Sequence, residues 1–439
     1  MHASVKTNEP RARISDNSVV GRLLGWSTFI ILSLGMFGFG FVLMLERMFG
    51  WSDQSLTVPY RVFILLCSVC SLGVVLVTKR RPVTRPYILP LGIFWVLYLV
   101  RFYVDAYYLG TSLSRSPDSL LFFIVGMCFL PMLAVLIEPG FHINSQAVKM
   151  SIVVLVLSCA SVLIFSRDVL YSNFGRLLVE GGINQITLGH FGVSLCLLCL
   201  YLLFSSRTGS KITNPILVGL TGFGLAIMGL ASSRSPIVAF ILLLPLLCLY
   251  GLRQGQKKRV VFLVGLLVCS LPFGIDTIKD MGSNVEDRVS STFSDVEDGT
   301  ESRLDLWKSA WEDFVDYPLT GRAFDGRYGM YPHNLLLESL MATGIVGGGS
   351  FLWILLIGIK AAWKLIHHSP EHAWLGFLFF QMLVYAMFSG ALWGHFSFWY
   401  MLAAVLARWH GPCVILSAQP VKNRSSVLST ATPFLGGGN

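Results

Sequence analysis

SLLFFIVGMCFLPMLAVLI, residues 119–137, is a run of nineteen residues without a single charge. About 20 apolar residues at a rise of 1.5 Å each cross the hydrocarbon core of a bilayer, so this run predicts a transmembrane helix. Eleven further apolar runs lie along the 439 residues, at 24–45, 60–78, 87–104, 150–166, 186–204, 212–231, 235–251, 259–274, 345–366, 373–392 and 395–409. The sequence therefore predicts an all-α membrane protein with about 12 transmembrane helices.

The composition excludes the soluble classes of protein. Hydrophobic residues make up 54% of the chain and charged residues 13%, whereas a soluble domain carries about 25% charged residues. A net charge of +9 would suit a nucleic-acid-binding protein, but the Lys and Arg residues lie in short loops between apolar runs. That distribution is typical of membrane topology. Two CxxC spacings, Cys67/Cys70 and Cys196/Cys199, fall inside uncharged runs, where cysteine behaves as a small hydrophobe rather than a metal ligand.

The Lys and Arg residues also predict which side of the membrane each loop occupies. With a cytoplasmic N-terminus, the cytoplasmic segments carry 20 of them and the short outside loops carry seven, as the positive-inside rule requires. This bias predicts a cytoplasmic tail over 1–23, helices 1–9 over 24–274, and a large outside loop over 275–344. Helices 10–12 then follow over 345–409, and a disordered cytoplasmic tail over 410–439 ends the chain.

The large outside loop differs from all the others in being acidic. Residues 275–333 hold thirteen acids against six bases. Within them, residues 303–317 place apolar side chains at helical spacing, which predicts an amphipathic helix on the membrane surface; these side chains are Leu304, Trp307, Ala310, Trp311 and Phe314. The acidic run DVEDGTE at 295–301 could ligate calcium, but the spacing of acids alone is unspecific, and no P-loop or metal-ligand spacing occurs.

Three segments carry a family resemblance. They are SSRSP at 232–236, RLDLWKSAWEDFVDYPLTG at 303–321 and HNLLLESLMATGIVG at 333–347. The Arg-x-x-x-Trp helix, the Pro-x-x-Gly turn, the His-Asn-x-x-Leu-Glu motif and the Ser-Arg-Ser turn resemble the O-antigen ligase and polymerase superfamily, over roughly residues 185–400.

This resemblance implies a GT-C-like arrangement of about 12 helices in the bacterial inner membrane, with one large periplasmic loop and an active site facing the periplasm. It implies a glycosyltransferase that moves a glycan from undecaprenyl pyrophosphate to a lipid-linked glycan or to lipid A–core, with no cofactor and no metal.

The chemistry of such a transfer selects the candidate site residues. Arginine binds phosphate through a fixed fork of donors, which favours Arg234 and Arg303, and more weakly Arg322 and Arg327, as partners of the donor pyrophosphate. The alternatives are a snorkelling anchor for Arg234 and a surface ion pair with Glu301 or Asp305 for Arg303. These two arginines and one histidine are the predicted catalytic residues.

That histidine is His333, which the resemblance places at the family's catalytic position, as a base or as a group that orients the acceptor. Asn334 is expected to cap the following helix. Glu338 is expected to make a polar contact inside the bundle. Four lower-ranked polar residues lie near helix ends and could line a cavity: His190, Arg101, Asp105 and His395.

The sequence leaves three kinds of function to compare: transfer of a glycan by a polymerase or ligase, protein O-glycosylation, and transport. An acidic outside loop suits poorly the docking of phosphorylated lipid A–core, so a polymerase of O-antigen, capsule or exopolysaccharide repeat units is favoured over a ligase. Protein O-glycosylation would use the same chemistry. A transporter or flippase is disfavoured, because no inverted repeat is evident and the polar motifs gather at one face.

Overall fold

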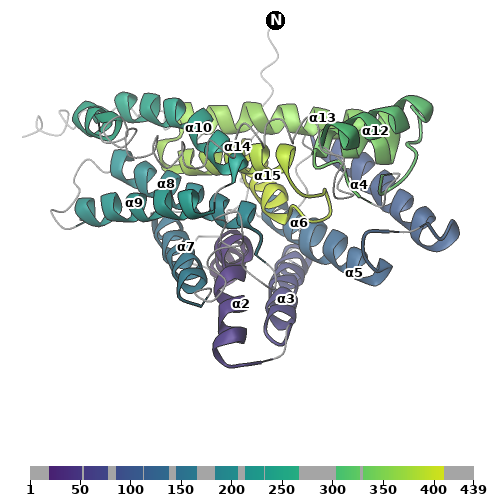
Figure 1. Ribbon diagram of the computed structural model, residues 1–439, viewed down its shortest axis with the longest axis horizontal. Coiled ribbons are helices and arrows are strands. Elements are labelled where there is room, and N and C mark those ends of the chain that lie inside the picture. Colours follow the sequence, from purple (N-terminus) through teal and green to yellow (C-terminus); the bar gives the residue numbers. More distant parts are fainter. Residues whose placement is uncertain are drawn as a thin grey trace, which may run out of the picture. The chain divides into compact units, whose positions relative to one another are not determined.

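The computed structural model describes residues 19–51, 54–77, 86–111, 113–137, 145–165, 183–205, 213–231, 233–265, 303–326 and 330–409. The acidic run 295–301, Arg327, and the tails 1–18 and 410–439 lie outside these ranges, so the predictions made for them are not addressed. Within the described residues the chain forms helices and loops and no strand (Figure 1).

Fourteen labelled α-helices follow one another along the described chain. They are α1 (Val19–Ile30), α2 (Phe39–Met48), α3 (Thr57–Val77), α4 (Ile88–Tyr103), α5 (Pro117–Leu121), α6 (Leu130–Ile137), α7 (Ser145–Phe165), α8 (Gln185–Ser205), α9 (Thr213–Leu230), α10 (Arg234–Arg253), α12 (Arg303–Asp316), α13 (Leu335–His368), α14 (Ala373–Phe388) and α15 (Phe396–Trp409). Three π-helical stretches, η1 (Ile31–Gly35), η2 (Val104–Tyr108) and η3 (Phe122–Phe129), continue α1, α4 and α5, and a 3-10 turn, η5 (Pro370–His372), precedes α14.

Every predicted apolar run overlaps a helix, although only residues 259–265 of the ninth run are described. Seven helices of the described chain are long and apolar enough to cross a membrane, or eight if the bent pair Leu23–Gly35 and Phe39–Met48 is one span. Two shorter apolar helices are Asn214–Leu230 and Phe396–Arg408. A multi-pass helical membrane protein is therefore confirmed, while the number 12 stays a prediction.

Two runs differ in shape from what the sequence predicts. The first bends by 65° between its two halves. The helix predicted from residue 345 begins ten residues earlier, at Leu335, and breaks at Gly344, which has φ 63° and ψ −164°. A side chain at Gly344 would meet the Leu319 carbonyl oxygen at 2.4 Å, so the preceding loop packs against this break because glycine leaves room for it.

Helix α8 is the most enclosed of the candidate membrane-spanning helices, because 83% of the residues in its 18-residue apolar stretch are buried. It packs against α9, α10, α7 and α14. Gly192 of α8 faces Gly224 of α9 so closely that a Cβ at Gly192 would lie 2.5 Å from the Gly224 carbonyl oxygen. Small residues allow this approach of two helix backbones. The buried Cys196 thiol donates to the Thr221 carbonyl oxygen at 3.3 Å, which fits its expected role as a packing residue.

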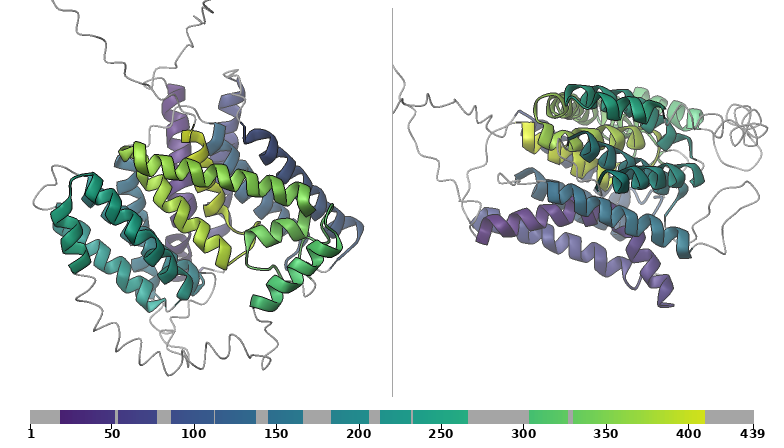
Figure 2. Two further views of the ribbon diagram at one scale, coloured as in Figure 1. Left: turned by 90° about the horizontal axis from the view of Figure 1, so that it is seen from above. Right: turned by 90° about the vertical axis from the view of Figure 1, so that its left-hand side faces the viewer.

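Helices α4, α13 and α15 enclose the aromatic part of the buried core. The Phe94 ring stacks at 5.6–5.7 Å on Tyr98 and Trp399, and the Phe351 ring lies 5.1 Å from it. The views from above and from the side show α13 and α15 crossing over the N-terminal helices (Figure 2). This core fixes α13, and with it the residues that precede α13, against the rest of the bundle.

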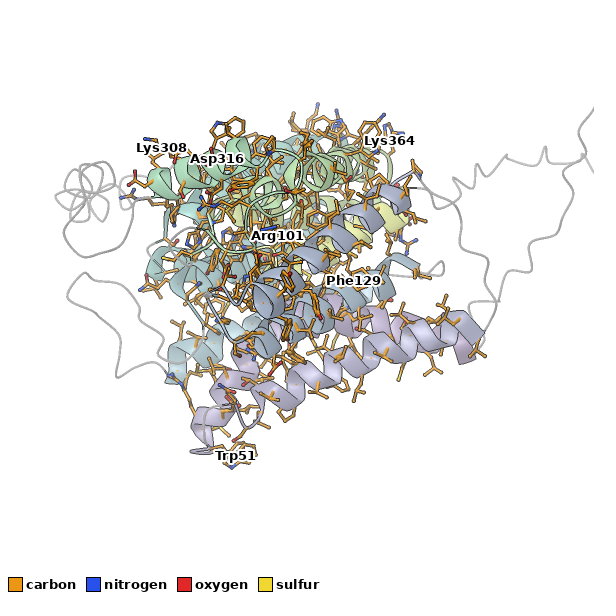
Figure 3. The ribbon with its side chains drawn as sticks, turned by 90° about the vertical axis from the view of Figure 1, so that its right-hand side faces the viewer. Trp51, Arg101, Phe129, Lys308, Asp316 and Lys364 are labelled. Carbon is orange, nitrogen blue, oxygen red and sulfur yellow. The ribbon has the colours of Figure 1, made fainter. Side chains whose placement is uncertain are left out.

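Helix α12 matches the amphipathic helix predicted over 303–317. Leu306 and Ala310 are buried against α13, while Leu304 and Trp311 are exposed and available to the membrane surface. Figure 3 shows Lys308 and Asp316 of α12 at one end of the helices and Lys364 of α13 at the other end. The loop around α12 and the start of α13 therefore share one end of the bundle.

Candidate functional site

His333 occupies a constrained turn directly before α13. Its φ is +55°, a left-handed conformation that few residues other than glycine adopt and that often marks functional positions. The next residue, Asn334, accepts hydrogen bonds from the backbone N–H groups of Leu336 and Leu337 at 3.1 and 3.2 Å, so the expected N-cap is confirmed. The cap fixes where α13 begins and holds His333 at its mouth.

The surroundings of His333 determine which ring nitrogen of its imidazole carries a proton. Partial burial and the positive charge of Arg303 lower the pKa of His333 to about 4, so the ring is neutral near pH 7. The backbone N–H of Gly390 donates to Nδ1 at 3.1 Å. A neutral imidazole has one donor and one acceptor nitrogen, so the remaining proton resides on Nε2. His333 therefore presents an N–H donor, not a free lone pair, from Nε2.

Arg234 and Arg303 each open a helix, α10 and α12. Partial burial and the charge of Arg234 lower the pKa of Arg303, which shows that the two guanidinium groups are electrostatic neighbours. The charge of Arg303 also acts on His333. Arg303 is thus within electrostatic range of both other predicted catalytic residues, which lie 69 residues before it and 30 residues after it in the chain. Helix N-termini add exposed N–H groups and the positive end of the helix dipole, which favour an anion.

Arg322, the third predicted phosphate ligand, has a partner in its own loop. Its guanidinium forms an ion pair with the fully buried Asp313, and its backbone N–H donates to the Met341 carbonyl oxygen at 2.8 Å. Breaking a buried pair leaves an uncompensated charge. The structure therefore gives Arg322 a role in holding the loop before α13 in place.

Arg101 and Asp105 serve the same loop. Arg101 pairs with Asp105 at 3.3 Å, and the buried Asp105 carboxylate accepts the backbone N–H of Phe324 at 2.5 Å. A second buried acid, Asp325, accepts the Ser114 backbone N–H at 2.7 Å. These contacts join the loop 317–326 to the end of α4.

Glu338 reaches His333 indirectly. Its fully buried carboxylate accepts the backbone N–H of Leu392 at 2.9 and 3.0 Å and lies 3.3 Å from the Tyr98 hydroxyl. Leu392 lies two residues after Gly390, the donor to His333. Glu338 therefore fixes the turn 389–395 that orients the imidazole, a more specific role than the polar contact expected from the sequence.

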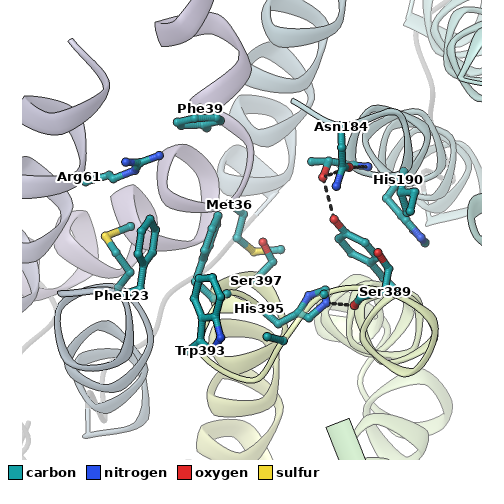
Figure 4. Close-up of a pocket in the computed structure, with 18 of the residues that line it drawn as sticks. Met36, Phe39, Arg61, Phe123, Asn184, His190, Ser389, Trp393, His395 and Ser397 are labelled. Atoms are coloured by element: carbon teal, nitrogen blue, oxygen red, sulfur yellow. Dashed lines mark hydrogen bonds between the residues drawn. The ribbon is translucent and has the colours of Figure 1, made fainter. Parts of the chain in front are cut away.

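A cavity of about 530 Å³ opens beside this turn (Figure 4). Of the predicted site residues, His333, His190 and His395 line it, while Arg234, Arg303 and Arg322 do not. His190 is buried, shares a hydrogen bond of 3.0 Å between Nε2 and the Ser235 hydroxyl, and stacks on the Tyr385 ring at 4.1 Å. Because Ser235 follows Arg234, this bond connects the Ser-Arg-Ser turn to the cavity wall.

Three charged residues of the cavity were not among the sequence candidates. Arg61 of α3 and Arg115 before α5 serve only as outside charges in the topology prediction, and the sequence predicts no role for Glu46 of α2. All three lie in predicted outside segments, which is the one signal that could have grouped them. Among the described residues, no group of three His, Cys, Asp or Glu side chains has the placement of a metal site.

Comparison with known protein families identifies part of this arrangement. Residues 219–352 match the O-antigen ligase family. This segment of the chain is similar to the O-antigen ligase family. The match confirms the resemblance to the O-antigen ligase and polymerase superfamily, and no curated protein matches the chain.

The segment that matches the O-antigen ligase family carries one half of the site. It runs from within α9 through α10 and α12 into α13, and it includes Arg234, Arg303 and His333. The cavity beside His333 draws most of its wall from outside the matched segment, from η1, α2, α3, η3, α8, α14 and the turn before α15. The family implies glycan transfer of the ligase or polymerase type by a multi-pass membrane protein.

Proposed function

We propose that the protein is a glycosyltransferase of the periplasmic face of the bacterial inner membrane, with an undecaprenyl-pyrophosphate-linked glycan as donor. The observation that carries the proposal is that Arg303 lies within electrostatic range of Arg234 and of His333, which lines the cavity. Two guanidinium groups suit a pyrophosphate, and the neutral histidine suits an uncharged hydroxyl or a phosphate oxygen.

In this mechanism the bond between the anomeric carbon of the donor sugar and its phosphate oxygen breaks, and a bond to the acceptor hydroxyl oxygen forms. Arg234 and Arg303 stabilise the charge that develops on the leaving pyrophosphate. The acceptor proton leaves to the departing pyrophosphate or to water. His333 donates its Nε2–H to a reacting oxygen and so orients it, and we propose that no resident metal is needed because the two arginines supply the positive charge.

We propose polymerisation of repeat units of an O-antigen, capsule or exopolysaccharide as the activity, on the grounds of the acidic outside loop. Ligation to lipid A–core is the second candidate, and one observation favours it. Arg61 and Arg115 line the cavity together, so the chain has a cluster of positive charge, in segments predicted to lie outside, that the net charge of the loop does not reveal.

Deletion of the gene separates these two activities. If the protein is the polymerase, the deletion strain accumulates single repeat units on the lipid carrier or on the core, and long chains disappear. Gel separation of glycans released from both fractions measures this. Long chains that remain on the carrier beside a bare core would reject polymerisation and establish ligation. Wild-type glycans in both fractions would reject both.

A further inference from the structure

The cavity beside His333 contains a pair of arginines held by aromatic rings. The Arg61 Cζ lies 5.0 Å from the centre of the Phe39 ring and 5.1 Å from that of Phe123. The Arg115 Cζ lies 5.6 Å from the same Phe123 ring and 5.3 Å from the Trp393 ring. Figure 4 shows Arg61 between Phe39 and Phe123, with Trp393 on the neighbouring wall. The shared Phe123 ring therefore holds two like charges close together.

Aromatic rings hold these two guanidinium groups in place, a role that carboxylates commonly have in proteins. Cation–π contact uses the flat face of a guanidinium and leaves its N–H edges free to bind oxygen atoms. Among the described residues, no carboxylate oxygen lies within 4.0 Å of Arg61 or Arg115. Arg115 disfavours the charge on Arg61 more than the nearby Glu46 favours it, and an anion with several oxygens would satisfy both guanidinium groups.

The other polar groups of the cavity leave room for such an anion. Glu46 directs one carboxylate oxygen to the backbone N–H groups of Leu56 and Thr57, at 2.5 and 2.7 Å, and so caps the start of α3. The indole N–H of Trp393 is buried and has no hydrogen-bond partner, although buried donors are nearly always paired. Trp393 therefore contributes its ring, and not this buried N–H group, to the cavity, where the ring contacts Arg115.

We propose that Arg61 and Arg115 bind a phosphate group of the acceptor, so that the enzyme takes a phosphate-bearing glycolipid as its acceptor. The proposal rests on the proposed glycan transfer. His333 lines this cavity and is also within electrostatic range of Arg303, so the histidine is near both cationic sites. The donor pyrophosphate occupies the site of Arg234 and Arg303, and the acceptor occupies the site of Arg61 and Arg115.

The remaining wall suits the sugar part of such an acceptor. A cavity of about 530 Å³ falls within the size range of small-molecule sites, about 300–1,000 Å³. Tyr331, Tyr385 and Trp393 present aromatic rings to it, and such rings offer apolar faces with polar tips to a glycan. The same phosphate chemistry occurs in a lipid-diphosphate-linked repeat unit and in a phosphorylated core glycolipid.

Steady-state transfer by the full-length protein in lipid vesicles tests the proposal. One lipid-diphosphate-linked donor is combined with four acceptors: a diphosphate-linked repeat unit, a phosphorylated core glycolipid, and a phosphate-free counterpart of each. Arg61→Gln and Arg115→Gln are each expected to lower kcat/KM for a phosphate-bearing acceptor about 10- to 100-fold. The phosphate-bearing acceptor that wild type uses identifies the natural source.

Three comparisons make the result specific. Transfer to the phosphate-free counterpart is expected to change less than about threefold in the variants, and so is the KM for the donor. Arg47→Gln, an outside arginine of α2 that does not line the cavity, is expected to match wild type for all acceptors.

An equal loss with and without acceptor phosphate would overturn the assignment, and so would a raised donor KM, which would place the donor pyrophosphate at Arg61 and Arg115. Failure of the underlying function would look different, because wild type itself would then leave the donor intact.

Discussion

Replacing Arg234 or Arg303 with lysine is expected to lower the rate of glycan transfer by roughly 100-fold or more, nearly as much as replacement with alanine. Lysine keeps the charge but loses the planar fork that holds two phosphate oxygens at once. The two positions open α10 and α12, and the charge of Arg234 acts on Arg303, so in this account both guanidinium groups serve one donor site. Initial rates with a lipid-linked donor measure the effect.

Arg253→Lys is the matched control, because Arg253 is the last residue of the same helix α10 and lies far along it from Arg234. This variant is expected to transfer at the wild-type rate. Lysine variants at positions 234 and 303 that retain more than a tenth of wild-type activity would show that charge alone suffices there, and the bidentate account of the donor site would be lost.

His333→Ala is expected to lower transfer about 10²- to 10³-fold while the protein still inserts and accumulates normally. His333→Gln distinguishes the two roles that the sequence leaves open, because a glutamine amide can donate a hydrogen bond but cannot act as a base. Since Gly390 occupies Nδ1 and leaves the proton on Nε2, the glutamine variant is expected to recover at least about tenfold over alanine. Equal inactivity of the two variants would favour a base.

The pH dependence of kcat/KM gives a second readout of His333. Because burial and Arg303 lower the pKa of His333 to about 4, the neutral ring persists as the pH falls and is lost only near pH 4. The profile is therefore expected to be flat from about pH 5.5 to 8. A histidine with its ordinary pKa of about 6.5 would cut activity about tenfold by pH 5.5, and that result would contradict the assigned protonation state.

Elements with a strong local signal could be predicted from the sequence. Long uncharged runs predict helices because the cost of an exposed backbone in lipid leaves few alternatives. The amphipathic helix at 303–317 and the Asn334 cap depend on neighbours within one or two turns. The break at Gly344 escaped prediction, because a glycine inside an apolar run has the same local pattern whether or not a loop packs against it.

The half of the site that the sequence does not predict depends on contacts between distant segments of the chain. In the sequence, the turn 389–395 is only the junction between two apolar runs. Its role becomes clear from two hydrogen bonds, in which the backbone N–H of Gly390 donates to His333 and that of Leu392 donates to Glu338. Arg61 and Arg115 looked like ordinary outside charges. Their pairing on Phe123 joins α3 to the segment that holds both Arg115 and Phe123, and only the packed bundle brings these two together.

Transfer by the purified protein in the presence of EDTA tests the central claim most directly. Vesicles containing the protein, an undecaprenyl-pyrophosphate-linked glycan and a phosphate-bearing acceptor are expected to yield the joined glycan and free undecaprenyl pyrophosphate in equal amounts. The rate is expected to be the same with and without the chelator, because Arg234 and Arg303 supply the positive charge. A donor that stays intact with wild-type protein, or transfer that stops in EDTA and returns with magnesium or calcium, would contradict this account.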